Sequence, residues 1–344
     1  MRSRAWNLYT NVGVVSPQSR GQYLDGGRYL TSGLWAEGDA RLWERVEVRA
    51  GGRVALAAAK AEGDPASGSA AVDRRWVAPV GSAGVGVRAT EWLKVQVGVD
   101  QGFRAPNLDD LTSRQQVGPG FQLENADLRP ERATSLEAGV KVTHRWFEAS
   151  FFAFESRISG LIARTPRMTS ECPGMTDGCA ASQTVFQLTN LDGLARIRGF
   201  DGVARVFLPA GFGARATIAY AWGDGPNVVP GGSPSREPLS RIPPLNGTAE
   251  VTWRSRRLGF FAGSGLRWAT TQTRLALSDM SDVRIPRGGT PGFVVVDVRA
   301  GYRWGARSLV SLALENVGNA AYRYHGSSVN GPGRGLAVLI ELGF

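Results

Sequence analysis

The most regular feature of the sequence is an alternation of apolar and polar residues within short segments. Around residues 46–56, the even positions Val46, Val48 and Val54 are apolar, whereas the odd positions Glu47 and Arg49 are charged. A period of two places successive side chains on opposite sides of an extended chain. The pattern therefore predicts β-strands with one apolar face. The same alternation recurs over residues 93–100, 135–142, 214–220, 258–266, 294–301 and 336–344. Residues 147–160 are less regular, because phenylalanines occupy both faces, and there we expect a bulge.

The connections between these segments alternate in length. Short turns are expected near residues 41–44, 90–92, 144–146, 209–212, 255–257 and 303–307. Long polar stretches, rich in glycine and proline, are expected near residues 17–27, 58–75, 104–133, 164–183, 223–243, 269–291 and 317–333. Six short and seven long connections predict fourteen strands. In an up-and-down order, every short turn then lies at one end of the sheet and every long loop at the other.

Two all-β folds show this kind of alternation, a soluble sandwich and a transmembrane barrel. The even strand number and the separation of short turns from long loops favour the barrel. Aromatic residues at the short turns also favour it, since tryptophan gathers at membrane interfaces: Trp43, Trp92, Trp146, Trp253 and Trp304. Lipid cannot hydrogen-bond the backbone, so a spanning sheet satisfies its polar groups between strands. We expect an antiparallel up-and-down transmembrane β-barrel of about 14 strands.

Composition narrows the class of protein further. The chain has 344 residues, of which 42% are apolar, so a disordered polymer is excluded. It contains no apolar run of ten residues, which excludes a helical membrane span. The net charge of +10 would suit nucleic acid, but the arginines are scattered singly, so we expect no nucleic-acid partner. Residues 1–10 lack the apolar core of a signal peptide.

Few residues suggest metal or catalytic chemistry. Cys172 and Cys179 are too few for a zinc site, but the turn residues between them suit a small disulfide loop. A disulfide there would imply an oxidising compartment. His144 and His325 have no neighbouring pattern of metal ligands or nucleophiles. We therefore expect no catalytic residues, no metal, no cofactor and no enzyme activity.

Several motifs follow one another in a consistent order along the chain. They are GFRAPNLDDL at 102–111, NADLRPE at 125–131, RIPPL at 241–245, and the residues Glu315, Asn316, Asn319, Tyr322 and Arg323, which are followed by Gly333 and Arg334. Between the second motif and the third lie Asn190, Ala195, Ile197, Gly199, Phe200 and Asp201. In this order, over residues from about 30 to 344, the chain resembles the C-terminal barrel of TonB-dependent outer-membrane receptors. The terminal Phe344, with apolar residues at alternate positions before it, resembles the assembly signature of outer-membrane barrels.

The resemblance implies a fold and a domain organisation. Such receptors have a 22-stranded barrel filled by an N-terminal plug, and this chain would supply the last fourteen strands. Residues 1–344 are then a single C-terminal barrel segment, without plug, TonB box, signal peptide or the first eight strands. A fragment, a mis-called start and a decayed gene all fit this reading. Without a plug for TonB to pull, the isolated chain is not expected to be an active transporter.

The resemblance also implies a function in the bacterial outer membrane. It is the energised uptake of a scarce ligand, such as a ferric siderophore, with outer-membrane lipid and the TonB complex as partners. The alternative is a passive porin-like channel. A third class, an outer-membrane enzyme, would need an Asp/His or Ser/His set near the rim, which two isolated histidines do not supply.

Five residues are candidates for ligand contact at the extracellular rim. They are Arg104, Asn107, Tyr322, Tyr324 and His325. A structural role is also open for each: Arg104 can pair with Asp109 or Asp110, and the aromatic rings can pack within the loop. Charged residues on the polar face of the strands are expected to hydrate the lumen or to pair with a plug: Arg45, Glu47, Arg49, Lys94, Glu137 and Lys141.

Overall fold

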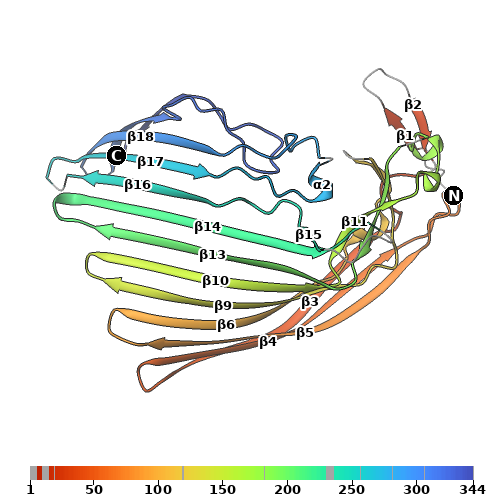
Figure 1. Ribbon diagram of the computed structural model, residues 1–344, viewed down its shortest axis with the longest axis horizontal. Helices are drawn as coiled ribbons and strands as arrows, with labels where there is room; N and C mark the ends of the chain where they lie inside the picture. Colours follow the sequence, from red (N-terminus) through yellow and green to blue (C-terminus); the bar gives the residue numbers. More distant parts are fainter. Residues whose placement is uncertain are drawn as a thin grey trace.

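A large antiparallel β-sheet dominates the computed structural model (Figure 1), which describes residues 6–9, 15–18, 20–117, 120–181, 183–229, 236–255, 257–280, 282–305 and 307–343. The sheet has fourteen strands, as the alternation predicts. Their bounds are β3 Arg28–Leu42, β4 Val46–Ala61, β5 Val72–Arg88, β6 Leu93–Arg104, β9 Glu131–His144, β10 Phe147–Ser159, β13 Leu194–Phe207, β14 Phe212–Pro226, β15 Arg236–Pro238, β16 Asn246–Arg254, β17 Phe260–Ala269, β18 Phe293–Trp304, β19 Ser308–Glu315 and β20 Gly335–Glu341.

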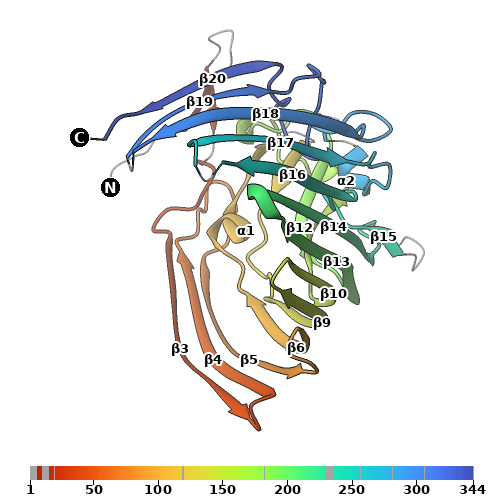
Figure 2. The ribbon, with the colours of Figure 1, turned by 90° about the vertical axis from the view of Figure 1, so that its left-hand side faces the viewer.

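The strands follow an up-and-down order. Each long strand pairs with the next one, and the short β15 pairs with the end of β14. Short turns lie at the left end in Figure 1 and long loops at the right end, as the connection lengths predict. The sheet bends into an arc from β3 to β20 (Figure 2). Among the described residues these two strands each have one neighbour, so the sheet is open.

One of the fourteen strands differs from the expected set. The residues before the long loop at 17–27 were expected to form the first strand of the sheet. Instead, β1 (Trp6–Tyr9) and β2 (Val15–Gln18) pair with each other in a separate two-stranded sheet. The fourteenth strand is β15, because the loop after β14 folds back and pairs Asp224 with Pro238. Phe344, the expected assembly signature, lies outside the described residues.

The bulge expected within residues 147–160 is absent, because β10 pairs without interruption with both β9 and β13. The reason is that glycines make room for its aromatic rings. Phe152 lies over Gly139 and Phe154 over Gly199, and a β-carbon at either glycine would come within 3 Å of the ring. Aromatic side chains therefore fit on both faces of a regular strand.

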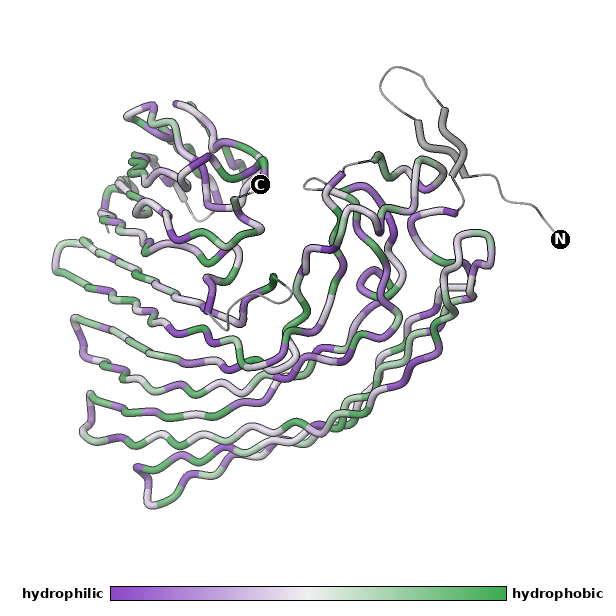
Figure 3. The backbone as a smooth tube through the Cα atoms, turned by 45° about the vertical axis from the view of Figure 1, so that its right-hand side comes forward, coloured by the Kyte–Doolittle hydropathy of each residue, from purple (hydrophilic) through white to green (hydrophobic). Residues whose placement is uncertain are grey.

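The two faces of the sheet differ in polarity and in what covers them. Alternate positions on the outer face carry exposed aliphatic side chains, including Leu34, Val54, Val77, Val97 and Leu136. The hydropathy colours of Figure 3 alternate along the same strands. Buried strand residues such as Ala59, Val72 and Val295 lie instead on the inner face, where loops pack. This inversion, with large apolar residues outside, is typical of a membrane barrel.

The long loops build a small second sheet that the sequence pattern did not predict. Its strands are β7 Gln115–Val117, β8 Gly120–Leu123, β11 Ile162–Arg167 and β12 Val185–Asn190, in the order β11-β12-β8-β7. Helix α1 (Leu108–Thr112) buries Leu111 against Ala59 and Val72 of the barrel wall. Helix α2 (Leu277–Met280) and short 3-10 turns at Thr169–Glu171, Met175–Asp177 and Pro209–Gly211 complete the elements. In the described chain, no helix has the length and apolar character needed to span a membrane.

A disulfide and ion pairs hold this loop assembly together. Cys172 and Cys179 are joined, with their sulfurs 2.13 Å apart. The half-buried Arg114 guanidinium donates to Glu124 Oε1 at 3.2 Å and to Asp177 Oδ2 at 2.7 Å. Because Asp177 lies inside the disulfide loop, Arg114 ties that loop to the small sheet.

Candidate functional site

The first candidate pair, Arg104 and Asn107, organises the start of a long loop. Arg104 Nη1 donates to Asp110 Oδ2 at 2.7 Å, and its Nε donates to Glu131 Oε2 at 2.7 Å. Asn107 caps helix α1, because its Oδ1 accepts from the backbone N–H of Asp110 at 2.8 Å. Of the two acidic partners considered for Arg104, Asp110 is the one it pairs with. Both side chains thus hold the loop in place, which is the structural role described above.

The second candidate group lies in an aromatic cluster at the long-loop end of the sheet. Phe293, the first residue of β18, packs its ring 5.1 Å from that of Tyr322 and 5.3 Å from that of Tyr324. The rings of Tyr322 and Tyr324 meet edge to face at 6.0 Å. Tyr322 is buried, whereas Tyr324 is 54% exposed. The cluster therefore presents one aromatic ring to its surroundings on a rigid, buried base.

Hydrogen bonds of a buried asparagine give the aromatic loop its shape. Asn316, at a φ of +46°, follows directly after β19. Its Nδ2 donates to the carbonyls of Ala320 at 2.9 Å and Pro332 at 3.0 Å, and its Oδ1 accepts from the Ala320 N–H. Gly331 passes directly over the Tyr322 ring, where a β-carbon would lie 2.0 Å from a ring carbon. The loop is thus closed at its base and pressed onto the ring.

His325 lies next to the cluster and is half-buried. Its Nδ1 is 2.9 Å from the hydroxyl of Thr290. Its Nε2 is buried and, within the described part of the chain, has no hydrogen-bond partner. Burial lowers the pKa of His325 below its ordinary value, and the positive charge of Arg241 acts in the same direction, whereas Asp279 opposes it. The ring is therefore neutral over a wider pH range than an exposed histidine.

Arginines surround the cluster. The Arg267 guanidinium lies 5.6 Å from the centre of the Tyr322 ring. Arg241 and Arg284 both donate to Asp282, at 3.0 Å and 2.5 Å. Burial lowers the pKa of Arg164 on β11, and the nearby charge of Arg241 lowers it further. The loop end thus combines aromatic rings with more positive than negative side chains.

Sequence reasoning missed two members of this cluster, Phe293 and Arg267. A signal for Phe293 was present, because it is an aromatic residue on the polar face of its strand. The contact with Arg267 depends on a loop that returns from a distant strand, so the strand pattern gave no sign of it. Among the described residues, no group of three or more His, Cys, Asp or Glu side chains is arranged to hold a metal ion.

Of the charged residues expected in the lumen, Arg45 lies in the turn before β4, and the other five lie on the inner face: Glu47, Arg49, Lys94, Glu137 and Lys141. Glu47 bonds Lys94 and accepts from Arg41 at 3.4 Å. Arg49 Nε lies 3.4 Å from Glu37 Oε1. The Lys141 ammonium lies 5.5 Å from the centre of the Phe152 ring. The inner wall near the short turns is therefore a polar surface of interlocked charges.

Long antiparallel strands, an apolar outer face, a charged inner face and loops folded at one end define an outer-membrane type of β-barrel. The sequence matches the TonB-dependent receptor-like β-barrel family over residues 2–320. The chain therefore belongs to this family, whose members are transport receptors of the outer membrane. No curated protein matches the sequence.

Solved structures of transporters and receptors share the fold. The copper transporter OprC has a TM-score of 0.75 and 21% identity, over 96% of this chain and 49% of that chain. The FrpB iron transporter from Neisseria meningitidis has a TM-score of 0.66 and 18% identity, over 90% and 45%. The Serratia marcescens receptor HasR, solved with its hemophore HasA and heme, has a TM-score of 0.69 and 16% identity, over 94% and 53%. This chain spans about half the length of these proteins.

Proposed function

We propose that this chain is the barrel part of an outer-membrane receptor for the energised uptake of a scarce ligand. The TonB complex is the proposed partner of the complete receptor, and lipid surrounds its apolar outer face. Family membership supports this proposal, and so does the likeness to metal, iron and heme transport proteins. The folded loops at one end favour a receptor over a passive porin-like channel.

The observation that carries the proposal is the aromatic and basic cluster at the loop end. Tyr324 offers an exposed ring on a base made of Phe293 and Tyr322. Arg164, Arg241, Arg267 and Arg284 lie at this end against the carboxylates of Asp279, Asp282 and Asp297, so positive charge is in slight excess there. A ligand that is both aromatic and anionic suits such a surface. A ferric catecholate siderophore has these two properties, and we propose this class.

Binding of a simple ferric tris-catecholate complex to the full chain in detergent tests the proposal. Quenching of protein fluorescence would report the affinity. Tyr324→Ala is expected to weaken binding roughly threefold to tenfold, since one aromatic contact contributes about 0.5–1.5 kcal/mol. Tyr324→Phe keeps the ring and should bind like the wild type.

Tyr23→Ala provides the matched control. Tyr23 is 48% exposed, close to the value for Tyr324, but it lies beside helix α1. The control should bind like the wild type. The ligand class is wrong if the full chain does not bind the complex, or if both alanine variants weaken binding equally.

A further inference from the structure

The outer face of the sheet changes character toward the long-loop end. Near the short turns this face carries aliphatic residues such as Val95, Val140 and Leu136. Farther along, arginines take the same face on neighbouring strands. By register they are Arg75, Arg132, Arg157, Arg196 and Arg198. Glu155 lies on the same face and pairs with Arg157 and Arg198, so the positive charge without a partner lies mainly with the other arginines. Basic residues directly above an apolar band are where a membrane protein meets the headgroups of lipids.

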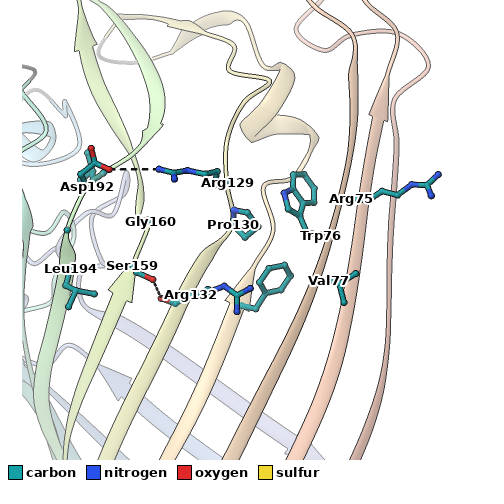
Figure 4. A pocket seen from close by; sticks show the side chains of 13 residues that line it. Arg75, Trp76, Val77, Arg129, Pro130, Arg132, Ser159, Gly160, Asp192 and Leu194 are labelled. Atoms are coloured by element: carbon teal, nitrogen blue, oxygen red, sulfur yellow. Dashed lines mark hydrogen bonds and ion pairs between the residues drawn. The ribbon is translucent and has the colours of Figure 1, made fainter.

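A groove opens in this region because two neighbouring strands separate. The pairing of β5 with β6 extends only from Arg88 to Ser82, although β5 continues to Val72. Arg75, Trp76 and Phe103 line the groove that results, together with Arg129, Arg132 and Leu194. Figure 4 shows Arg129 above Arg132, and Arg75 on the far side of Trp76.

Apolar side chains accompany the arginines of the groove, Phe103 beside Arg132 and Val77 on the membrane side of Arg75. Val77 is 58% exposed and lies on the outer face of β5, because it pairs with Leu56 of β4. Phe103 pairs with Arg132 across β6 and β9, so both side chains lie on the outer face as well. The guanidinium of Arg132 lies 6.0 Å from the centre of the Phe103 ring. Apolar and cationic surfaces are therefore adjacent, as an amphipathic ligand requires.

Positive charge in the groove is mostly uncompensated. Arg75 and Arg132 are exposed, and in the described parts of the chain neither has an acidic partner within 4.0 Å. Arg129 reaches Asp192 only at 4.0 Å, and both side chains are largely exposed, so this pair contributes little. The groove is thus lined by three arginines, Arg75, Arg129 and Arg132, and by one carboxylate, that of Asp192.

We propose that this groove binds an anionic, phosphate-bearing lipid of the surrounding leaflet. Arg132 receives the headgroup phosphate, because a guanidinium group forms paired hydrogen bonds with phosphate oxygens, and Arg75 on the other wall of the groove adds electrostatic attraction for the anionic lipid. Val77 and Phe103 contact the upper part of the acyl chains. The proposal rests on the outer-membrane placement proposed above, and it adds a specific lipid site that is separate from the aromatic cluster.

Native mass spectrometry of the full chain in detergent tests this site. The probes are a phosphatidylglycerol, which is anionic, and a phosphatidylcholine with the same acyl chains, which has no net charge. The wild type should bind phosphatidylglycerol more tightly. The double variant Arg75→Gln and Arg132→Gln should weaken that binding about tenfold or more, since each basic residue contributes roughly 1 kcal/mol near an anionic surface.

A second double variant, Arg53→Gln and Arg215→Gln, removes the same charge from the inner face of the sheet. It should keep the affinity of the wild type for phosphatidylglycerol. Equal binding of the two lipids by the wild type, or equal weakening in the two double variants, would overturn the proposal. Binding of the ferric tris-catecholate should be unchanged in the double variant Arg75→Gln and Arg132→Gln, so a failure of the lipid site is distinct from a failure of the proposed function.

Discussion

The side chain of Asn316 donates to the carbonyl of Pro332 at 3.0 Å, which joins the two ends of the loop that carries Tyr322 and Tyr324. Asn316 is 1% exposed, and its backbone lies in the left-handed region, which asparagine tolerates better than most residues. Its amide also bonds both backbone groups of Ala320. One side chain thus sets the shape of the aromatic loop.

Asn316→Ala is therefore expected to open the loop. It removes three hydrogen bonds of the buried amide, to the carbonyls of Ala320 and Pro332 and from the Ala320 N–H, at a cost of about 3 kcal/mol in local stability. Backbone hydrogen exchange over residues 316–334 should become roughly a hundredfold faster. Asn330→Ala is the control, because Asn330 is exposed and accepts a single bond from Arg323. Equal exchange rates in the two variants would show that Asn316 does not hold the loop.

Gly331 should not tolerate a side chain. An added β-carbon would come within 2.4 Å of three ring carbons of Tyr322. Gly331→Ala must therefore displace either the loop or the ring, at a cost of about 1–3 kcal/mol. The near-ultraviolet circular dichroism of the tyrosine cluster should decrease. Gly318→Ala, in the same loop but with no atom within 4 Å of its added carbon, should leave the spectrum unchanged.

The lowered pKa of His325 predicts a dependence of stability on pH. Because burial disfavours the charged ring, the unfolded chain binds this proton more readily than the folded one. Stability should thus be greatest above about pH 6.5, the ordinary histidine value, and should fall as pH decreases through it toward the folded pKa. His325→Gln should remove this part of the dependence.

Denaturant unfolding of both proteins at pH 7.5 and 5.5 would measure the effect. Carboxylates titrate in both proteins, so the informative quantity is the difference between wild type and variant. A difference that is the same at the two pH values would contradict the prediction.

The strands and turns of the large sheet were predictable, because a single local rule governs them. Most strands alternate strictly enough that the face of a residue such as Val54 or Arg49 follows from its position. The break in the alternation at Phe152 led to the wrong prediction of a bulge. The space for the Phe152 ring is provided by Gly139, which lies on another strand. Information of that kind is not local.

The loop assembly was not predictable for the same reason. Its strands have three to six residues, and β12 and β8 pair in parallel across about sixty residues of chain. Of the site, the tyrosines Tyr322 and Tyr324 were found because aromatic residues are conspicuous in a polar loop. The contacts of Phe293 and Arg267 with Tyr322 could not be predicted, because these residues lie on strands that are distant from Tyr322 in the sequence.

The disulfide provides the last prediction. The Cys172–Cys179 bond closes a loop that contains Asp177, which receives a 2.7 Å hydrogen bond from Arg114. Opening this short loop should cost about 2.5 kcal/mol by chain entropy. The double variant Cys172→Ser and Cys179→Ser should therefore exchange backbone hydrogens faster in β7, β8 and β12, whereas the barrel strands β9 and β10 keep the wild-type rate. A reducing agent should give the wild type the same pattern and leave the variant unchanged, and an effect that spread equally to β9 and β10 would refute a local role.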